Sequence, residues 1–269
     1  MNYRLIFVGL IILLNSCSTY RTNDKQLKMF EGKYKKLAQA VEIEDENKIR
    51  ELVKKHNLDV DFQLPVTGTT LLMWAVDNDK YTSSKTLLEL GANPNLKNFD
   101  SETSALMFAA NKYETSDYVR LLLKHGGDAN DSSKFKGANH LRTPLIAASS
   151  TRLESVKLLV EHGADVNYMS HHRQTAVLYA INSSKIDIAR YLIIEQGADF
   201  KKAVGVTIDG DSIYIVNDLR GCLFPLDSED YKIKMEIVEF MKSQGVDYRS
   251  TPIPKHYYNN YDSTYLEKY

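Results

Sequence analysis

A phrase that ends an apolar run with glycine recurs along this chain, and its spacing constrains the fold more than any other feature. The clear copies span residues 90–95, 125–130, 162–167 and 196–200, with weaker copies near Asn57 and Gly245. With the glycine position as marker (57, 91, 126, 163, 197 and 245), the successive spacings are 34, 35, 37, 34 and 48 residues. Periods of this size are typical of repeat architectures in which each unit contacts mainly its neighbours. Six units fit the pattern.

A second phrase precedes each of four markers and predicts where a first helix begins. It reads Thr-Leu-Leu-Met-Trp-Ala from Thr70, and matching phrases start at Ser104, Thr143 and Thr175, 20 to 22 residues before the glycine. A Ser or Thr hydroxyl at this place caps a helix by accepting a free backbone amide. Pro144 fits the first helical position, where a missing N–H costs nothing.

A second helix is predicted in each unit from apolar residues at helical spacing, as in residues 86–90, 118–123, 156–160 and 188–193. The marker glycine then ends this helix in the left-handed conformation, a role that Asn57 fills in the first unit. A helix pair of this size cannot bury both faces alone, so neighbouring units are expected to stack into a shared core.

The paired phrases resemble the signature T-P-L-H-x-A of the ankyrin-repeat family. Met, Ile or Leu replaces the His in all four copies, and only the copy at Thr143 keeps the proline. The resemblance implies an all-α fold, an ankyrin-repeat solenoid of about six helix-turn-helix units with β-hairpin fingers. The expected repeat domain covers residues 34–252, with units at about 34–66, 67–99, 100–138, 139–171, 172–206 and 207–252.

The two ends depart from the repeat as terminal caps do. The first unit lacks the helix-start phrase and is highly charged, and in the last unit residues 212–216 are predicted to begin a first helix. From Ser212 to Gly245 there are 33 residues, 12 more than the 21 between Thr70 and Gly91, which indicates an insertion at residues 222–234. Residues 253–269 are rich in tyrosine and are expected to form a tail that either lies along the last helix pair or is loose.

The N-terminal sixteen residues have the layout of a signal peptide, with Arg4 ahead of an apolar run from Leu5 to Leu14. Ten apolar residues are too few for a helix that crosses a bilayer, which needs about 20. Leu14-Asn15-Ser16-Cys17 resembles the bacterial lipobox, although Asn15 departs from the usual small residue. The resemblance implies lipidation of Cys17, a polar tether at residues 17–33 and, because Ser18 follows, an outer-membrane lipoprotein that faces the periplasm in a diderm host. The alternative is an ordinary cleaved signal that contains a cysteine.

Charge and cysteine content argue against a nucleic-acid-binding protein and against a fold stabilised by disulfides. The formal net charge is −1, and removal of Arg4 with the signal peptide makes it −2. This near-neutral charge gives no sign of the clustered Lys and Arg residues on which nucleic-acid binding depends, so nucleic acid is not expected as a partner. Lipidation of Cys17 leaves Cys222 without an intramolecular disulfide partner. Apolar neighbours favour Cys222 as a buried small hydrophobe over a reactive thiol.

Several short motifs imitate catalytic or metal sites without completing them. Residues 210–214 begin like a nucleophile elbow, but Tyr214 stands in place of the second glycine. His171 and His172 are adjacent and do not share a helix face, and residues 209–211 lack the acidic residue that a calcium loop needs in register. We therefore expect no enzyme activity, no cofactor and no metal. A hydrolase with its site in the insertion at 222–234 is the alternative, although it lacks a base beside a nucleophile.

Trp74, Phe108 and Tyr179 each precede the alanine of a first helix. Equivalent positions in stacked repeats touch each other, so an internal aromatic ladder is favoured over a ligand-binding box.

The expected function is protein binding on a concave surface, as the family resemblance implies. Hairpin tips of stacked units are expected to align in one row, with the finger from Asp131 to Arg142 overhanging it and Phe135 as an apolar anchor. The alternative is that Phe135 folds back on its own hairpin. The predicted partner-binding residues are Lys112, Tyr113, Phe135, His140, Arg142, Arg152, His171, His172 and Arg173. The partner is expected to be a protein rather than a small molecule, and an immunity or envelope-protective role fits an exported binding module.

Overall fold

The computed structural model describes residues 28–112, 114–134, 141–170, 172–206, 210–259 and 261–268. The predictions for the signal peptide at 1–16 and for Cys17, Tyr113, Phe135, His140 and His171 lie outside these residues. The chain divides into an N-terminal unit that ends at Phe108 and a C-terminal unit that begins at Ala109.

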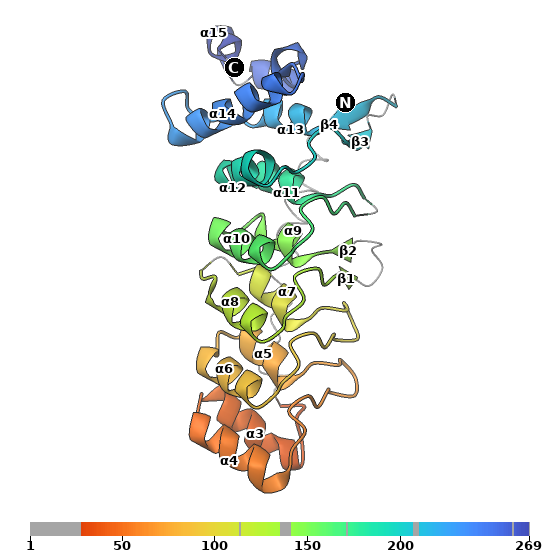
Figure 1. Ribbon diagram of the computed structural model, residues 1–269, viewed down its shortest axis with the longest axis vertical. Coiled ribbons are helices and arrows are strands. Elements are labelled where there is room, and N and C mark those ends of the chain that lie inside the picture. Colours follow the sequence, from red (N-terminus) through yellow and green to blue (C-terminus); the bar gives the residue numbers. More distant parts are fainter. Residues whose placement is uncertain are drawn as a thin grey trace. The chain divides into compact units, whose positions relative to one another are not determined.

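The N-terminal unit is built from helix pairs: α3 (Lys33–Glu42) with α4 (Glu46–His56), then α5 (Leu71–Asp77) with α6 (Tyr81–Glu89) (Figure 1). The first helices α3 and α5 contact each other, and so do the second helices α4 and α6. Helix α7 (Ala105–Ala110) crosses the boundary between the two units. First helices therefore form one layer of this unit and second helices another.

The C-terminal unit repeats the same arrangement. Its helices are α8 (Asp117–Lys124), α9 (Pro144–Ala148), α10 (Leu153–Glu161), α11 (Ala176–Asn182), α12 (Ile186–Arg190) continued by the π-helical turn η2 (Tyr191–Glu195), α13 (Ile215–Gly221) and α14 (Glu229–Ser243). Along one layer α9, α11 and α13 contact in succession, and along the other α8, α10, α12 and α14 do. The predicted all-α repeat architecture is confirmed.

Local capping explains where the first helices begin. The hydroxyl oxygens of Thr70, Thr143 and Thr175 accept the backbone N–H groups of Met73 (3.1 Å), Ile146 (3.4 Å) and Leu178 (3.1 Å). Pro144 occupies the first turn of α9, as predicted. These bonds satisfy amide donors that a helix N-terminus otherwise leaves unpaired.

Left-handed residues end the second helices. Asn57 has φ 44°, and the marker glycines 91, 126, 163, 197 and 245 have φ between 66° and 94°. A residue with a Cβ is strained in this conformation, which is why glycine recurs at these positions. The prediction made for the marker glycines and for Asn57 is confirmed.

Short antiparallel strand pairs lie in two of the connecting segments of the C-terminal unit: β1 (Ser133–Lys134) with β2 (Leu141–Arg142), and β3 (Ala203–Val206) with β4 (Ser212–Tyr214). The prediction that a helix begins at Ser212 was wrong. Ser212 and Ile213 pair with Val206 and Gly205 across the ladder, so their backbone is extended. Helix α13 begins three residues later, where Asn217 Oδ1 accepts the Tyr214 N–H (2.8 Å).

The insertion and the tail are ordered parts of the C-terminal unit. Residues 222–228 form a connecting segment, and α14 begins at Glu229 with Ser228 Oγ accepting the Tyr231 N–H (3.1 Å). The predicted insertion at 222–234 therefore consists of this segment and the first turns of a longer helix. Beyond α14 follow η3 (Tyr248–Ser250), η4 (Lys255–Asn259) and α15 (Ser263–Glu267). The buried side chains of Ile253 and Leu266 show that the tail packs against its own unit.

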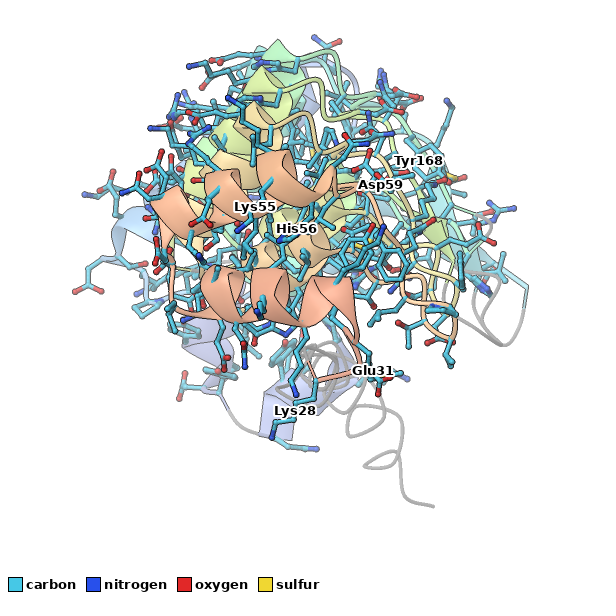
Figure 2. All side chains as sticks on the ribbon, turned by 90° about the horizontal axis from the view of Figure 1, so that it is seen from below. Lys28, Glu31, Lys55, His56, Asp59 and Tyr168 are labelled. Atoms are coloured by element: carbon cyan, nitrogen blue, oxygen red, sulfur yellow. The ribbon has the colours of Figure 1, made fainter. Side chains whose placement is uncertain are left out.

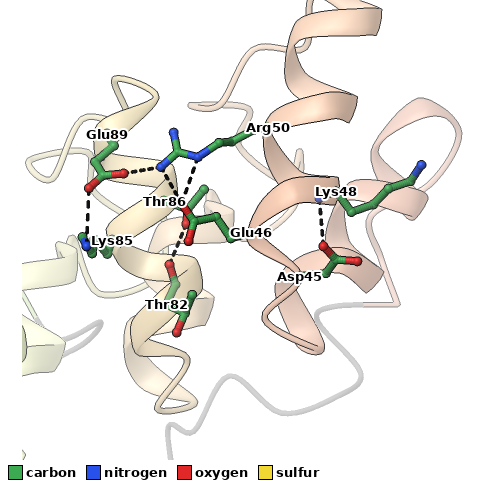
Figure 3. Close-up of polar contacts among 8 residues, drawn as sticks. All are labelled: Asp45, Glu46, Lys48, Arg50, Thr82, Lys85, Thr86 and Glu89. Carbon is green, nitrogen blue, oxygen red and sulfur yellow. Dashed lines mark hydrogen bonds and ion pairs between the residues drawn. The ribbon is translucent and has the colours of Figure 1, made fainter.

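Ion pairs link second helices of successive repeats. In the N-terminal unit Arg50 of α4 bonds Glu46 on its own helix (2.9 Å) and Glu89 on α6, and Lys85 lies 3.8 Å from Glu89 (Figure 3). In the C-terminal unit Arg120 pairs with Glu154 and Arg190 with Glu236. Exposed pairs of this kind are each worth at most about 1 kcal/mol, so packing of the apolar layers supplies most of the stability.

The outer end of the N-terminal unit is polar, as expected of a terminal repeat. Figure 2 labels Lys55 and His56 at the end of α4 and Asp59 just beyond it, and all three are exposed. The opposite side of the same pair is apolar, because Leu37 and Val41 of α3 and Ile49 of α4 are fully buried. In the part of the chain that the structure covers, every helix is too short or too polar to cross a membrane.

Candidate partner-binding surface

The predicted binding residues that the structure describes fall into two rows of the C-terminal unit. Arg142 ends β2, and His172 and Arg173 lie in the segment before α11; we call these three the finger row. Lys112 follows α7 and Arg152 precedes α10, and we call these two the turn row. The two rows lie at opposite ends of the first helices, so Lys112 and Arg152 do not lie on the hairpin tips, contrary to the prediction. Lys112 and Arg152 belong to the turn inside a repeat, whereas the finger row belongs to the connection between repeats.

Arg142 is held in a defined orientation at the base of its strand pair. Its Nε donates to Tyr179 Oη (3.1 Å), and its guanidinium carbon lies 4.6 Å from the centre of the Tyr179 ring. Both residues are half-buried. A guanidinium stacked on an aromatic ring loses less entropy when it binds an anionic group, since its orientation is already fixed.

This contact also revises the aromatic ladder. Trp74 is 1% exposed and lies in the core of the N-terminal unit, which fits an internal role. Phe108 is only half-buried. Tyr179 is half-buried as well, and its ring contacts the guanidinium of Arg142 at the surface. The three equivalent positions therefore do not share one environment.

His172 and Arg173 occupy a tight, preorganised turn and are both exposed. Arg173 has φ 58°, and its N–H donates to the Ser170 carbonyl (2.8 Å), while the Ser170 N–H donates to the Gln174 carbonyl (3.0 Å). The Arg173 side chain donates from Nη1 to the Ala203 carbonyl of β3 (3.2 Å). One finger segment is thus hydrogen-bonded to the next.

The turn row is less exposed than expected. Lys112 is half-buried, and its Nζ lies 5.4 Å from the centre of the Tyr118 ring. Arg152 is exposed and donates to the Glu114 carbonyl (3.4 Å). Cations of both rows contact local structure, and the finger row is the better candidate because Arg173 is bonded to the strand pair that carries the exposed Val206 and Tyr214.

Val66 and Phe99 of the N-terminal unit were not identified from the sequence as a pair of exposed apolar side chains. Phe99 is 55% exposed and Val66 is 72% exposed, in consecutive finger segments. The Phe99 N–H donates to the Thr67 carbonyl (2.8 Å), and the ring lies against Gly68, where an added Cβ would stand 2.6 Å from the ring. Gly68 has φ 68°. This glycine, two residues after an exposed valine, is the sequence signal that could have located the pair.

Apolar exposure recurs on the last strand pair of the C-terminal unit, where Val206 is 61% and Tyr214 is 41% exposed. The finger segments around it carry the cations of the finger row together with Lys201 and Lys202, and Lys202 pairs with Asp199 (3.4 Å). Aromatic and arginine side chains are enriched at protein–protein interfaces, whereas lysine is depleted, so Tyr214 and the arginines of the finger row are the residues that favour a binding surface here.

Asparagine and aspartate side chains hydrogen-bond successive finger segments to one another. Asn130 Oδ1 accepts the Asp165 N–H (2.8 Å), and Asn167 Oδ1 accepts the Asp199 N–H (2.7 Å). In the N-terminal unit Asp61 Oδ1 accepts the Asn93 N–H (2.8 Å). Burial raises the pKa of Asp61, although this bond opposes the shift.

The insertion lacks the features of a nucleophilic site. Burial raises the pKa of the Cys222 thiol, which disfavours the reactive thiolate. Lys234 is fully buried and donates from Nζ to the Cys222 carbonyl (2.7 Å). Among the described residues no three His, Cys, Asp or Glu side chains gather closely enough to hold a metal ion.

Two family models match the chain along these helix pairs and finger segments. A model of three ankyrin repeats matches residues 106–203, and a single-repeat model matches residues 67–99. The chain contains ankyrin repeats. The matched regions include the finger row and all of the turn row.

Relatives are similar over part of the chain. Ankyrin repeat and SOCS box protein 6 of Homo sapiens is 36% identical over 135 residues, which is 48% of this chain and 30% of that protein. Protein PhlB of Serratia liquefaciens is 37% identical over 84 residues, 31% of this chain and 36% of that protein. Human transient receptor potential cation channel subfamily A member 1 is 29% identical over 117 residues, 10% of its length. The chain thus spans about a third or less of the relatives that it matches.

Ankyrin repeats imply a module for protein–protein interaction, and ankyrin-repeat proteins are generally binding modules without catalysis. The repeat fold by itself does not select a partner, so the choice rests on the surface residues.

Proposed function

We propose that this chain is a non-enzymatic module of six ankyrin units that binds a protein partner on the finger row of its C-terminal unit. The supporting observation is that Arg142, His172 and Arg173 lie on consecutive finger segments, with Arg142 fixed on Tyr179 and Arg173 bonded to β3. A side chain whose orientation is already fixed loses less conformational entropy when it binds a partner. The nearby exposed Val206 and Tyr214 provide apolar area beside these cations.

The test is affinity capture followed by measurement of Kd with the recovered protein. Replacement of His172 and Arg173 together by alanine is expected to weaken binding of the principal partner at least tenfold, while thermal stability changes little because both residues are exposed. Lys124→Ala, at an exposed position in the last turn of α8, is the matched control and should bind normally. Equal Kd values for the double variant and the control would overturn the proposal.

We further propose that the module is tethered by a lipid on Cys17 and faces the periplasm from the outer membrane. Leu14-Asn15-Ser16-Cys17 at the end of the apolar run supports this. Cys17→Ala is expected to move the protein from the membrane fraction to the soluble fraction, and mass spectrometry of the mature N-terminus checks the modification. An unmodified N-terminus in the wild-type protein would refute the tether.

An immunity or envelope-protective role is the biological setting that we propose for such a module, since an exported binder meets exported proteins. Expression of the captured partner in the periplasm should harm cells that lack this chain and spare cells that produce it. Equal growth of both strains would exclude the role while leaving partner binding intact.

A further inference from the structure

The segment formed by residues 248–259 and 261–268 is fastened over the last helix pair, and we call it the strap. Tyr257 Oη donates to the Gly221 carbonyl (2.6 Å), and Tyr265 Oη donates to the Phe224 carbonyl (2.8 Å). Arg220 Nε donates to the Thr251 carbonyl (3.2 Å). Ile253 and Leu266 are buried against Leu223, Leu226 and neighbouring tyrosines. The strap is therefore attached by both polar and apolar contacts to the end of α13 and to the segment after it.

Beneath the strap lies a buried lysine. Lys234 of α14 is 0% exposed, and its Nζ donates to the Cys222 carbonyl (2.7 Å). Tyr248, the first residue of the strap, is 2% exposed, and the centre of its ring lies 5.2 Å from Lys234 Nζ. Lifting the strap away would expose the ammonium group to water.

A second cation contacts the same ring. The guanidinium carbon of Arg220 lies 4.6 Å from the centre of the Tyr248 ring, and Arg220 is 7% exposed. Two buried cations around one aromatic ring repel each other, and only Lys234 can relieve this repulsion by losing a proton.

We propose that the strap is a pH-responsive clamp: it docks over neutral Lys234 and loosens when Lys234 is protonated. This device goes beyond the proposed partner binding and stands or falls independently of it.

The direction of the response follows from burial. Desolvation lowers the pKa of Lys234 from 10.5 to about 7 in the docked structure; Cys222 opposes this shift, and Arg220 adds the smallest contribution to it. With the strap lifted, the pKa returns toward that of a free lysine, about 10.4. Between these values the undocked state binds more protons, so docking strengthens as pH rises from about 7 and is weakest at neutral pH and below.

The other groups around Lys234 do not obscure this window. Burial raises the pKa of Cys222 above its ordinary 9.0 and that of Tyr248 above 10.0, so both stay protonated up to about pH 9. Arg220 keeps its charge throughout. Asp230 acts on Cys222 from α14, and Arg249 acts on Tyr248 from η3. The interval from pH 7 to pH 9 therefore reports on Lys234.

Hydrogen exchange of strap amides, corrected for the intrinsic effect of pH, measures docking in the full chain. Protection is expected to rise between about tenfold and fifty-fold from pH 7 to pH 9 in the wild-type protein. Lys234→Met should abolish the rise and give high protection at both pH values. Lys232→Met, on the exposed side of the same helix where Lys232 pairs with Glu229, is the matched control and should keep the rise.

A Lys234→Met variant that retains the rise, or a wild-type strap whose protection does not change with pH, would overturn the proposal. Direct NMR titration of the Lys234 side chain covers the case in which that variant does not fold. A pKa near 7 is expected, and a pKa near 10 would contradict the clamp.

Discussion

Burial of an ionisable side chain changes its pKa, and Asp218 of α13 is an example in this protein. Its Oδ2 is buried, and among the described residues no hydrogen bond reaches it. Desolvation raises the pKa of Asp218 from 3.8 to about 6. A carboxyl group in this position is accommodated best in its neutral form.

The raised pKa of Asp218 predicts that the free energy of unfolding falls as pH rises from about 4 to about 6. In this interval the folded chain binds more protons than the unfolded chain, so each increase in pH favours unfolding, by up to about 3 kcal/mol in total. Asp218→Asn should flatten this part of the profile in denaturant unfolding. Asp211→Asn, at an exposed position shortly before α13, should not. Equal slopes for both variants would contradict the burial argument.

At the same scale, sequence alone predicted the residues whose role is local. The caps Thr70, Thr143 and Thr175 act within three residues, so the spacing of the phrase located them. The burial of Lys234 could not be predicted, because it depends on Tyr248 and on a strap that returns from far along the chain.

Helices and strands were predicted well where the period held and poorly where it failed. Helices α5, α9 and α11 begin directly after their predicted capping residues. Ser212 carries the same type of hydroxyl, yet its segment became β4, because pairing with β3 satisfies its backbone before the helix starts. The turn row was misassigned for another reason: the predicted helices after Thr143 and at 156–160 already place Arg152 between them, in the turn inside the repeat, and this order was not applied to the predicted surface.

Within an element, packing across repeats sets stability. Leu158 on α10 is 4% exposed, and α10 contacts both α8 and α12. Leu158→Ala is expected to lower the free energy of unfolding by roughly 2 to 5 kcal/mol through lost burial and a residual cavity. Lys157→Ala, at the half-buried neighbour, should cost much less. A loss below about 1 kcal/mol for Leu158→Ala in urea unfolding would remove this leucine from the core.

For the whole molecule, the repeat period predicted the class of fold and the family, because each ankyrin unit repeats the same helix caps and the same left-handed helix ends. The surface proposed for binding stays a prediction, and only some of its features follow from the sequence. Its finger row emerged from family resemblance, whereas the exposed pair of Val66 and Phe99 depends on Gly68 and on bonds between successive fingers. Surface chemistry is not constrained by the period, so sequence repetition says little about it.

Protection of backbone amides on partner binding tests the central claim most directly. Hydrogen exchange of the captured complex is expected to slow at residues 168–175 and 203–206, around the finger row of the C-terminal unit, and to stay unchanged along α10 and α14. Slowed exchange confined to α10 and α14, with the finger segments unaffected, would contradict binding on the finger row.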